Sequence, residues 1–221
     1  MQLIQRLDAI IAERHLLNHK FYQAWSRGEL SQEILQRYAA QYYHQVKSFP
    51  LFISRTHTRC PNIKVRQVLV DNLYDEDMHD HPALWMKFAQ GMGVSRADVL
   101  DEVPIRETEV MVNKFYELAE RSWEEGLCAL YAYECQVPEV SASKIAGLVD
   151  FYGIKDEETL AFFKEHQVYD VEHSKGVAEL IEQYVEPERA ERATREAADA
   201  LWGFLDGMCR IGNIACEGVC H

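Results

Sequence analysis

Apolar residues recur at intervals of three and four positions along almost the whole chain. This spacing places them on one face of an α-helix, and the alternation with a period of two that indicates strands is nowhere sustained. The 11 glycines and 6 prolines are sparse and fall at plausible breaks between the periodic stretches. The pattern predicts an all-α protein with helices over residues 2–16, 19–28, 31–57, 62–77, 82–92, 106–121, 123–137, 139–150, 156–184 and 187–216.

Long helices joined by short breaks favour a bundle whose core lies between antiparallel helices. The 221 residues are enough to bury the core of one domain. The sequence contains no internal repeat, no low-complexity tract and no linker rich in Ser, Gly or Pro. We therefore expect a single helical domain over residues 1–221.

The formal net charge of −13 limits the classes of partner. An acidic chain does not gain the counterion release that drives binding to nucleic acid or to an anionic membrane, so we expect neither as a partner. Charged residues interrupt the apolar positions of the first helix, which is therefore amphipathic rather than a signal peptide. We expect a cytoplasmic protein whose six cysteines are reduced thiols.

The helix predicted over residues 156–184 carries polar residues where its buried seam should be. Phe163 and Leu180 lie toward the two ends of the seam, whereas His166, Asp170 and His173 occupy its middle. Their spacing of i, i+4 and i+7 points all three the same way. Burying an unpaired carboxylate costs several kcal/mol, and a bound metal ion would supply the missing charge. The alternatives are a solvated polar patch and a hydrogen-bonded His–Asp pair.

Two further helices depart from the apolar pattern in the same manner. Glu134 stands where the stripe that includes Leu130 should continue, and Glu76 continues the stripe that includes Leu73. His81 follows just before Pro82, where the next helix should begin. Three carboxylates and three imidazoles suit two iron or manganese ions bridged by carboxylates, with no need for cysteine.

Several motifs resemble one known family along nearly the whole chain: HKFYQAW (19–25), NLYDE (72–76), HPALW (81–85), YAYECQVPE (131–139) and EHQVYDVEHSK (165–175). They are similar to the haem-oxygenase-like dimetal oxidases and oxygenases. Within these, they most resemble the Chlamydia protein associating with death domains and its bacterial para-aminobenzoate-synthesising relatives. The resemblance implies a haem-oxygenase-like helical bundle and the metal ligands Glu76, His81, Glu134, His166, Asp170 and His173.

The sequence departs from the resembled pattern between the first glutamate and the first histidine. Only four residues, DMHD, separate Glu76 from His81, fewer than in the relatives. Two residues at i and i+5 do not share a regular helix face, so a bulge or a helix end must bring them together. His79 at i+3 from Glu76 is a geometric rival, although the HPALW context favours His81.

The resemblance also implies a reaction. The relatives are implicated in making para-aminobenzoate for folate, and the family pattern suggests a self-sacrificing oxygenase that uses O2 and an external reductant. The matching positions are Tyr22, the expected source of the ring, Tyr133 beside Glu134, and Lys144, the expected amino donor. The metals would be two irons or an iron–manganese pair, since both accept the same ligands.

The sequence is also compatible with other functions. The same dimetal site could oxidise a diffusible small amine or acid, and a thiaminase-like hydrolase would use Cys128 or Cys135 as nucleophile. A protein-interaction module is a further alternative, although the sequence offers no exposed apolar stripe or basic patch for a partner. By analogy with this fold we expect a homodimer, and the sequence does not identify the electron donor.

Overall fold

The computed structural model describes residues 2–215, and within this range all regular structure is helical, which confirms the predicted all-α fold. The elements, in chain order, are α1 (Leu3–Glu13), the short 3₁₀ helix η1 (Leu16–Asn18), α2 (Lys20–Trp25), α3 (Gln32–Arg59), α4 (Ile63–Met78), α5 (His81–Gly91), α6 (Arg96–Asp101), α7 (Arg106–Arg121), α8 (Trp123–Glu134), α9 (Val137–Asp150), α10 (Glu157–Tyr184) and α11 (Pro187–Ile211). None of these helices is long and apolar enough to cross a membrane.

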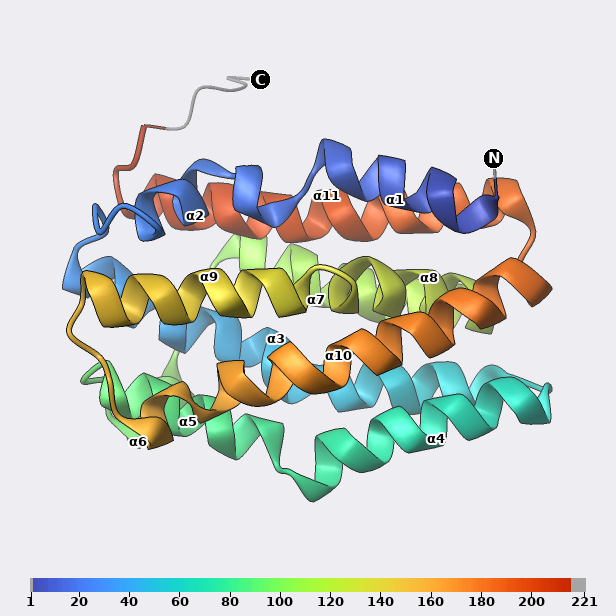
Figure 1. Cartoon of the computed structure of the whole chain (residues 1–221), viewed down its shortest axis with the longest axis horizontal. Coiled ribbons are helices and arrows are strands. Elements are labelled where there is room, and N and C mark those ends of the chain that lie inside the picture. Colours follow the sequence, from blue (N-terminus) through green and yellow to red (C-terminus); the bar gives the residue numbers. More distant parts are fainter. Residues whose placement is uncertain (1, 216–221) are drawn as a thin grey trace.

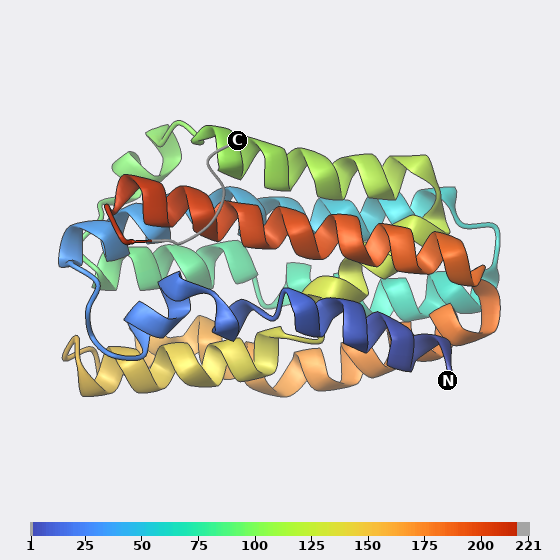
Figure 2. The same cartoon turned by 90° about the horizontal axis from the view of Figure 1, so that it is seen from above.

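The helices follow the long axis of the molecule and pack into one bundle (Figure 1). The helices α1, α2 and α11 lie together on one side, and α4, α5 and α6 lie on the other, with α10 running along the bundle at the front. Viewed from above, α11 lies between α7 and the pair formed by α1 and α2 (Figure 2). Every residue from Glu125 to Glu134 of α8 is buried, so this helix forms the centre of the core.

The observed helices differ from the predicted ones mainly at their ends. The predicted helix over residues 2–16 stops at Glu13 and is followed by η1. The last helix ends at Ile211 rather than at residue 216, because Gly212 forms its C-cap and Asn213 takes a positive φ of 51°; residue 216 itself lies outside the described range. The sequence pattern missed α6, which at six residues is too short to display helical periodicity.

Candidate metal centre

The corner between α4 and α5 brings Glu76 and His81 together. The helix α4 ends at Met78, since the ring of Pro82 would clash with the carbonyl of residue 78 in a continuous helix. Asp80 takes a left-handed conformation (φ 49°) and its carboxylate accepts a hydrogen bond from the Ala83 amide at 3.1 Å, which begins α5. This helix end places Glu76 Oε1 2.9 Å from His81 Nδ1.

A second proline corner positions Glu134. The ring of Pro138 stands four residues after Glu134, so α8 ends at this glutamate and α9 begins in a new direction. Glu134 is fully buried, and its Oε1 accepts a hydrogen bond of 2.5 Å from the amide group of Asn72 on α4. The carboxylate therefore projects from the central helix toward α4 and α10.

The helix α10 completes the site without a break. His166 and Asp170 are each only 3% exposed, whereas His173 is half-buried, so the polar residues do lie on the inner face of α10. With Glu76, His81 and Glu134 they form two groups, in each of which one ligand atom per residue lies within 4.8 Å of the others. We call the two groups together the metal centre; the inner group is Glu76, His81 and His166, and the second group is Glu134, Asp170 and His173.

The neighbours of two histidines orient their rings toward the metal centre. His166 Nδ1 lies 2.7 Å from the carbonyl oxygen of Phe162, and His173 Nε2 lies 2.9 Å from Asp75 Oδ2. Each ring therefore uses one nitrogen in an outer hydrogen bond and leaves the other as a lone-pair donor facing the carboxylates. Histidines that bind metals are usually held in this way.

Several buried atoms of the metal centre lack hydrogen-bond partners among the described residues. They include His173 Nδ1, Glu134 Oε2 and Asp170 Oδ2. An unpaired polar atom in a core costs about 1–3 kcal/mol, so three of them together call for a ligand. Nitrogen and carboxylate oxygen donors in this ratio suit iron or manganese, and the residues present fit such ions.

The pKa values of the residues in the metal centre also favour a bound cation. Burial and the charge of Asp170 raise the pKa of Glu134 to about 8, and burial raises the pKa of Asp170 to about 6. Burial would lower the pKa of His173, but the neighbouring Asp170 and Glu134 outweigh it and raise this pKa to about 9. Burial and the charge of His81 lower the pKa of His166 well below its usual value. Without a metal the site therefore holds protons that a divalent cation would displace.

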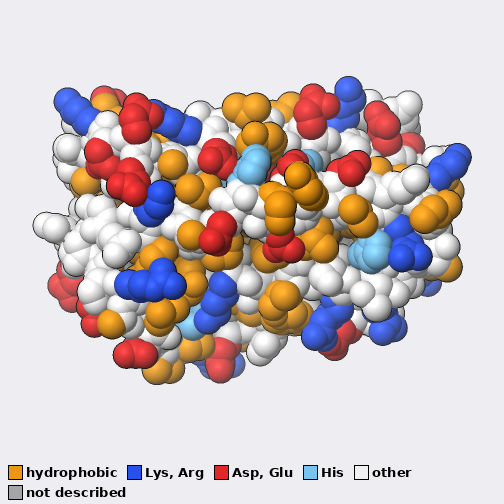
Figure 3. All heavy atoms as spheres, turned by 90° about the horizontal axis from the view of Figure 1, so that it is seen from below, with side chains coloured by type: hydrophobic (Ala, Val, Ile, Leu, Met, Phe, Trp, Pro, Cys, Tyr) orange, Lys and Arg blue, Asp and Glu red, His pale blue; other side chains and the backbone are white. Residues whose placement is uncertain are grey.

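His79, the rival of His81, lies at the edge of the metal centre. Its side chain is 34% exposed, compared with 2% for His81, and its Nδ1 lies 3.4 Å from Glu165 Oε2. His81 rather than His79 therefore faces Glu76 and His166. The molecular face that carries α4 and α5 shows histidine at the surface beside carboxylates and apolar side chains (Figure 3).

The expected ring source and amino donor lie together in the core. Lys144 on α9 and Tyr22 on α2 are 4% and 2% exposed, and the Lys144 Nζ atom lies 5.3 Å from the centroid of the Tyr22 ring. The indole of Trp25 donates a hydrogen bond to the Lys144 carbonyl at 3.3 Å. Gly147 permits this close packing of α9 on α2, because a Cβ there would lie 2.5 Å from the Trp25 ring. Burial lowers the pKa of Lys144 to about 7.

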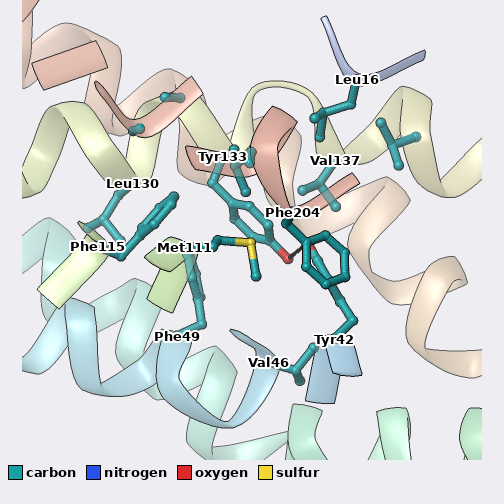
Figure 4. Packing of buried hydrophobic residues seen from close by; sticks show 14 of the residues in the cluster. Leu16, Tyr42, Val46, Phe49, Met111, Phe115, Leu130, Tyr133, Val137 and Phe204 are labelled. Carbon is teal, nitrogen blue, oxygen red and sulfur yellow. Dashed lines mark hydrogen bonds between the residues drawn. The ribbon is translucent and has the colours of Figure 1, made fainter. Parts of the chain in front are cut away.

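A chain of tyrosines connects the metal centre with Tyr22. Tyr133, which precedes Glu134, accepts a hydrogen bond of 3.2 Å from the Tyr42 hydroxyl, and the two phenols point toward one another (Figure 4). The Tyr42 and Tyr38 rings stack at 5.4 Å, and the Tyr38 and Tyr22 hydroxyls lie 2.9 Å apart. The sequence pattern showed Tyr38 and Tyr42 one helical turn apart, but core packing produces the same spacing.

The surroundings of Cys128 and Cys135 are unfavourable for a catalytic nucleophile. Cys128 is fully buried in α8, and burial raises its pKa, as it does for Cys135. A nucleophilic cysteine needs an accessible thiolate, so this environment disfavours a cysteine hydrolase. Cys216 and Cys220 lie outside the described residues.

The chain is similar in sequence to a known family and to several proteins of known activity. The sequence profile of a family described as iron-containing redox enzymes matches residues 36–205. The chain is 40% identical to the 4-aminobenzoate synthase of Nitrosomonas europaea, over 96% of this chain and 94% of the relative. It is 38% identical to the 4-aminobenzoate synthase of Chlamydia muridarum, over 94% of this chain and 90% of the relative.

A solved structure gives independent support for the fold. A TenA homologue from Pseudomonas syringae superposes with a TM-score of 0.82 at 20% identity, covering 94% of this chain and 91% of the other. The predicted family resemblance and the predicted haem-oxygenase-like fold are thus confirmed. The chain belongs to the haem-oxygenase-like family of iron-containing redox enzymes and is a homologue of the 4-aminobenzoate synthases.

Proposed function

We propose that the chain is a metal- and O2-dependent 4-aminobenzoate synthase that consumes its own Tyr22 and Lys144 to make the folate precursor. The observation that carries the proposal is the buried pair itself, with the Lys144 amine 5.3 Å from the Tyr22 ring centroid. The names of the relatives supply the product. The geometry supplies a ring and a nitrogen in one enclosed place.

In this proposal the metal centre holds two transition-metal ions, either two irons or an iron–manganese pair. The ligands are Glu76, His81, Glu134, His166, Asp170 and His173. With O2 and an external reductant, such ions supply an oxidant strong enough to take an electron and a proton from a phenol. The protein provides the ligands, the outer hydrogen bonds that fix them and a core that excludes water.

Lys144 is suited to act as an amino donor. An amine reacts only when it has lost its proton, and a pKa of about 7 leaves a substantial neutral fraction near neutral pH. Its Nζ atom lies between 5.2 and 5.6 Å from the centroids of five aromatic rings, so little space is left for a diffusible substrate. The rings belong to Tyr22, Tyr38, Tyr42, Trp85 and Phe163.

The tyrosine chain supports oxidation of Tyr22 at a distance from the metal centre. Burial raises the pKa of the Tyr22 phenol well above its usual value, so the phenol must give up its proton together with its electron. The Tyr38 hydroxyl, 2.9 Å away, is placed to receive that proton. Tyr133 and Tyr42 continue this contact to the residue before Glu134.

Isotope labelling tests the proposal. Protein containing ring-13C tyrosine and ε-15N lysine would be reconstituted with iron and manganese, reduced, and exposed to O2. We expect 4-aminobenzoate that carries both labels, at no more than one molecule per chain. Peptide mass spectrometry should then find the side-chain mass missing at Tyr22, and Tyr22→Phe and Lys144→Arg should each form no product.

Tyr116→Phe is a matched control, because Tyr116 also packs on a core phenylalanine, at 4.6 Å from Phe52, but lies outside the tyrosine chain. It should form as much product as the unaltered chain. Unlabelled product, or many turnovers per chain with Tyr22 intact, would instead establish oxidation of a diffusible amine or acid.

A further inference from the structure

A third cluster of residues that could hold a metal ion shares His81 with the metal centre and is partly exposed. His79, at the end of α4, and Glu165, on α10, each expose about a third of their side chains, with His79 34% and Glu165 33% exposed. Their ligand atoms and one nitrogen of His81 lie within 4.8 Å of one another. None of the functions argued above uses His79 or Glu165.

The distances in this cluster are close to those around a bound ion. Ligand atoms bound at about 2.1 Å to one transition-metal ion lie roughly 3.0–3.6 Å apart. Glu165 Oε2 lies within this range of His79 Nδ1, at 3.4 Å, and slightly beyond it from His81 Nε2, at 3.7 Å. The Tyr169 ring, 5.1 Å from the His79 ring, packs against this histidine. The three donor atoms could thus provide part of the coordination sphere of one metal ion.

A second observation indicates a ligand at this place. His81 is 1% exposed, and its Nε2 atom has no hydrogen-bond partner among the described residues although it faces Glu165. His79 Nδ1 and Glu165 Oε2 are also shielded from solvent without such a partner. Three buried donor atoms that converge without bonding to one another are costly unless a cation binds them.

We propose that His79, His81 and Glu165 form a loading site, which receives a divalent first-row metal ion from solvent and passes it to the inner group of Glu76, His81 and His166. The loading site rests on the inner group being a resident metal site, as proposed above. His81 belongs to both sites, with Nε2 toward Glu165 and Nδ1 2.9 Å from Glu76 Oε1.

Because His81 is shared by the two sites, the proposed transfer moves one ion at a time. A neutral imidazole carries a proton on one nitrogen and a lone pair on the other, so His81 binds a metal in only one of the two directions. An ion held at the loading site leaves it when the imidazole proton of His81 moves from Nδ1 to Nε2, so that the lone pair on Nδ1 faces the inner group and Glu76 and His166 replace the outer ligands. The exposed side chains of His79 and Glu165 then become free to bind the next ion.

Rapid mixing of metal-free protein with Co²⁺, followed by visible absorption, tests the loading site without turnover. We expect His79→Ala and Glu165→Gln to slow cobalt uptake about tenfold, the effect of losing one ligand, with the same final cobalt content as the unaltered chain. Glu172→Gln, which removes the same charge from an exposed position of α10, should leave uptake unchanged. Uptake at the unaltered rate in both variants would overturn the proposal, and so would a lower final cobalt content, because the residues would then be resident ligands.

Direct binding provides a second measurement. A chain with Glu76→Ala, His166→Ala and Asp170→Ala keeps His79, His81 and Glu165, and it should still bind Co²⁺ in equilibrium dialysis until His79→Ala is added. Cobalt binding that does not depend on His79 would contradict the loading site. The assays detect cobalt rather than 4-aminobenzoate, so a failure of the proposed synthase reaction would leave their outcome readable.

Discussion

Two clusters of charged residues in this molecule obtain their counter-charges in opposite ways. The first, which we call the ion-pair network, joins α7, α8 and α11. Arg121 lies 2.9 Å from Glu125, 2.6 Å from Glu117 and 2.7 Å from Glu196, and Lys114 lies 3.0 Å from Glu196. Here every carboxylate has a guanidinium or an ammonium within reach. In the metal centre the carboxylates of Glu76 and Asp170 lie beside histidines instead, and among the described residues neither forms an ion pair with Arg or Lys.

The carboxyl pKa values reflect this difference. The hydrogen bond from Arg121 lowers the pKa of Glu196 to about 2, whereas burial and a neighbouring carboxylate raise that of Glu134 to about 8. The ion-pair network is therefore complete with the protein's own cations. In the function proposed above, a cation from outside completes the metal centre, and this dependence would separate a functional cluster from a structural one.

Metal removal should have the largest effect on stability. An ion that binds only the folded state, at about 1,000 times its dissociation constant, adds about 4 kcal/mol to the free energy of unfolding. We expect chelation to lower the melting temperature measured by calorimetry, and re-addition of iron and manganese to restore it. Equal melting temperatures for the metal-free and metal-loaded chains would contradict the claim that the metal centre needs a bound cation.

Asp75→Asn should weaken metal binding without removing a ligand. Asp75 accepts the outer hydrogen bond of His173 at 2.9 Å, and loss of such a partner reduces metal affinity about 10- to 100-fold. A competition titration against a chromophoric chelator measures this affinity. Asp71→Asn, at an exposed position of the same helix, is the control and should bind as tightly as the unaltered chain.

The metal-free protein should lose stability as the pH rises from 6.5 to 8. A carboxyl group with a raised folded pKa, such as Glu134 at about 8, destabilises the folded state increasingly above its unfolded value of 4.5. An imidazole with a raised folded pKa, such as His173 at about 9, contributes stability that is lost above its unfolded value of 6.5. Together these two groups lower the free energy of unfolding over this window by on the order of 3 kcal/mol. Lys144, whose folded pKa of about 7 lies below its unfolded value of 10.5, opposes them by on the order of 1 kcal/mol, so the expected net loss is on the order of 2 kcal/mol.

Urea unfolding of the metal-free chain at several pH values measures this loss. The metal-loaded chain should not show it, since its ligands are already deprotonated. The ion-pair network should not contribute either, because the stability that comes from Glu196 is lost only as the pH falls from 4.5 through about 2. Metal-free protein whose stability stays constant or rises from pH 6.5 to 8 would contradict the assignment.

Arg121→Ala should have the smallest of these effects and should leave the metal centre unchanged. The Arg121 side chain is 33% exposed, so solvent screens its ion pairs, and we expect a loss of about 1 kcal/mol with unaltered metal content. Arg96→Ala, at an exposed position, should cost less in the same urea titration. A change in metal affinity in Arg121→Ala would show that the two clusters are coupled.

Local pattern was sufficient to predict most of the fold. The predicted helix over residues 106–121 coincides with α7, and that over 156–184 begins one residue before α10, because both carry long amphipathic stripes with clear N-caps or first-turn acids. The sequence pattern predicted the turn after Met78 less completely. Pro82 indicated a break, but it did not indicate that Asp80 would turn the chain in a left-handed conformation with a φ of 49°.

The candidate site was predictable only where a single helix displayed it. His166, Asp170 and His173 interrupt an apolar seam, so their spacing was visible, whereas Asp75, Asn72 and Glu165 touch the site from positions that are polar for ordinary reasons. Their roles arise from pairing between α4, α8 and α10, which no local pattern encodes. The tyrosine chain is another example, since it joins residues of α2, α3 and α8.

Elemental analysis of freshly purified, unsupplemented protein tests the central claim most directly, with a Glu134→Ala, His166→Ala variant measured alongside. The account predicts about two equivalents of iron, or of iron plus manganese, in the unaltered chain and loss of that metal in a variant that keeps its helical circular dichroism. No transition metal in the unaltered chain, even after reconstitution with both metals under reducing conditions, would contradict it.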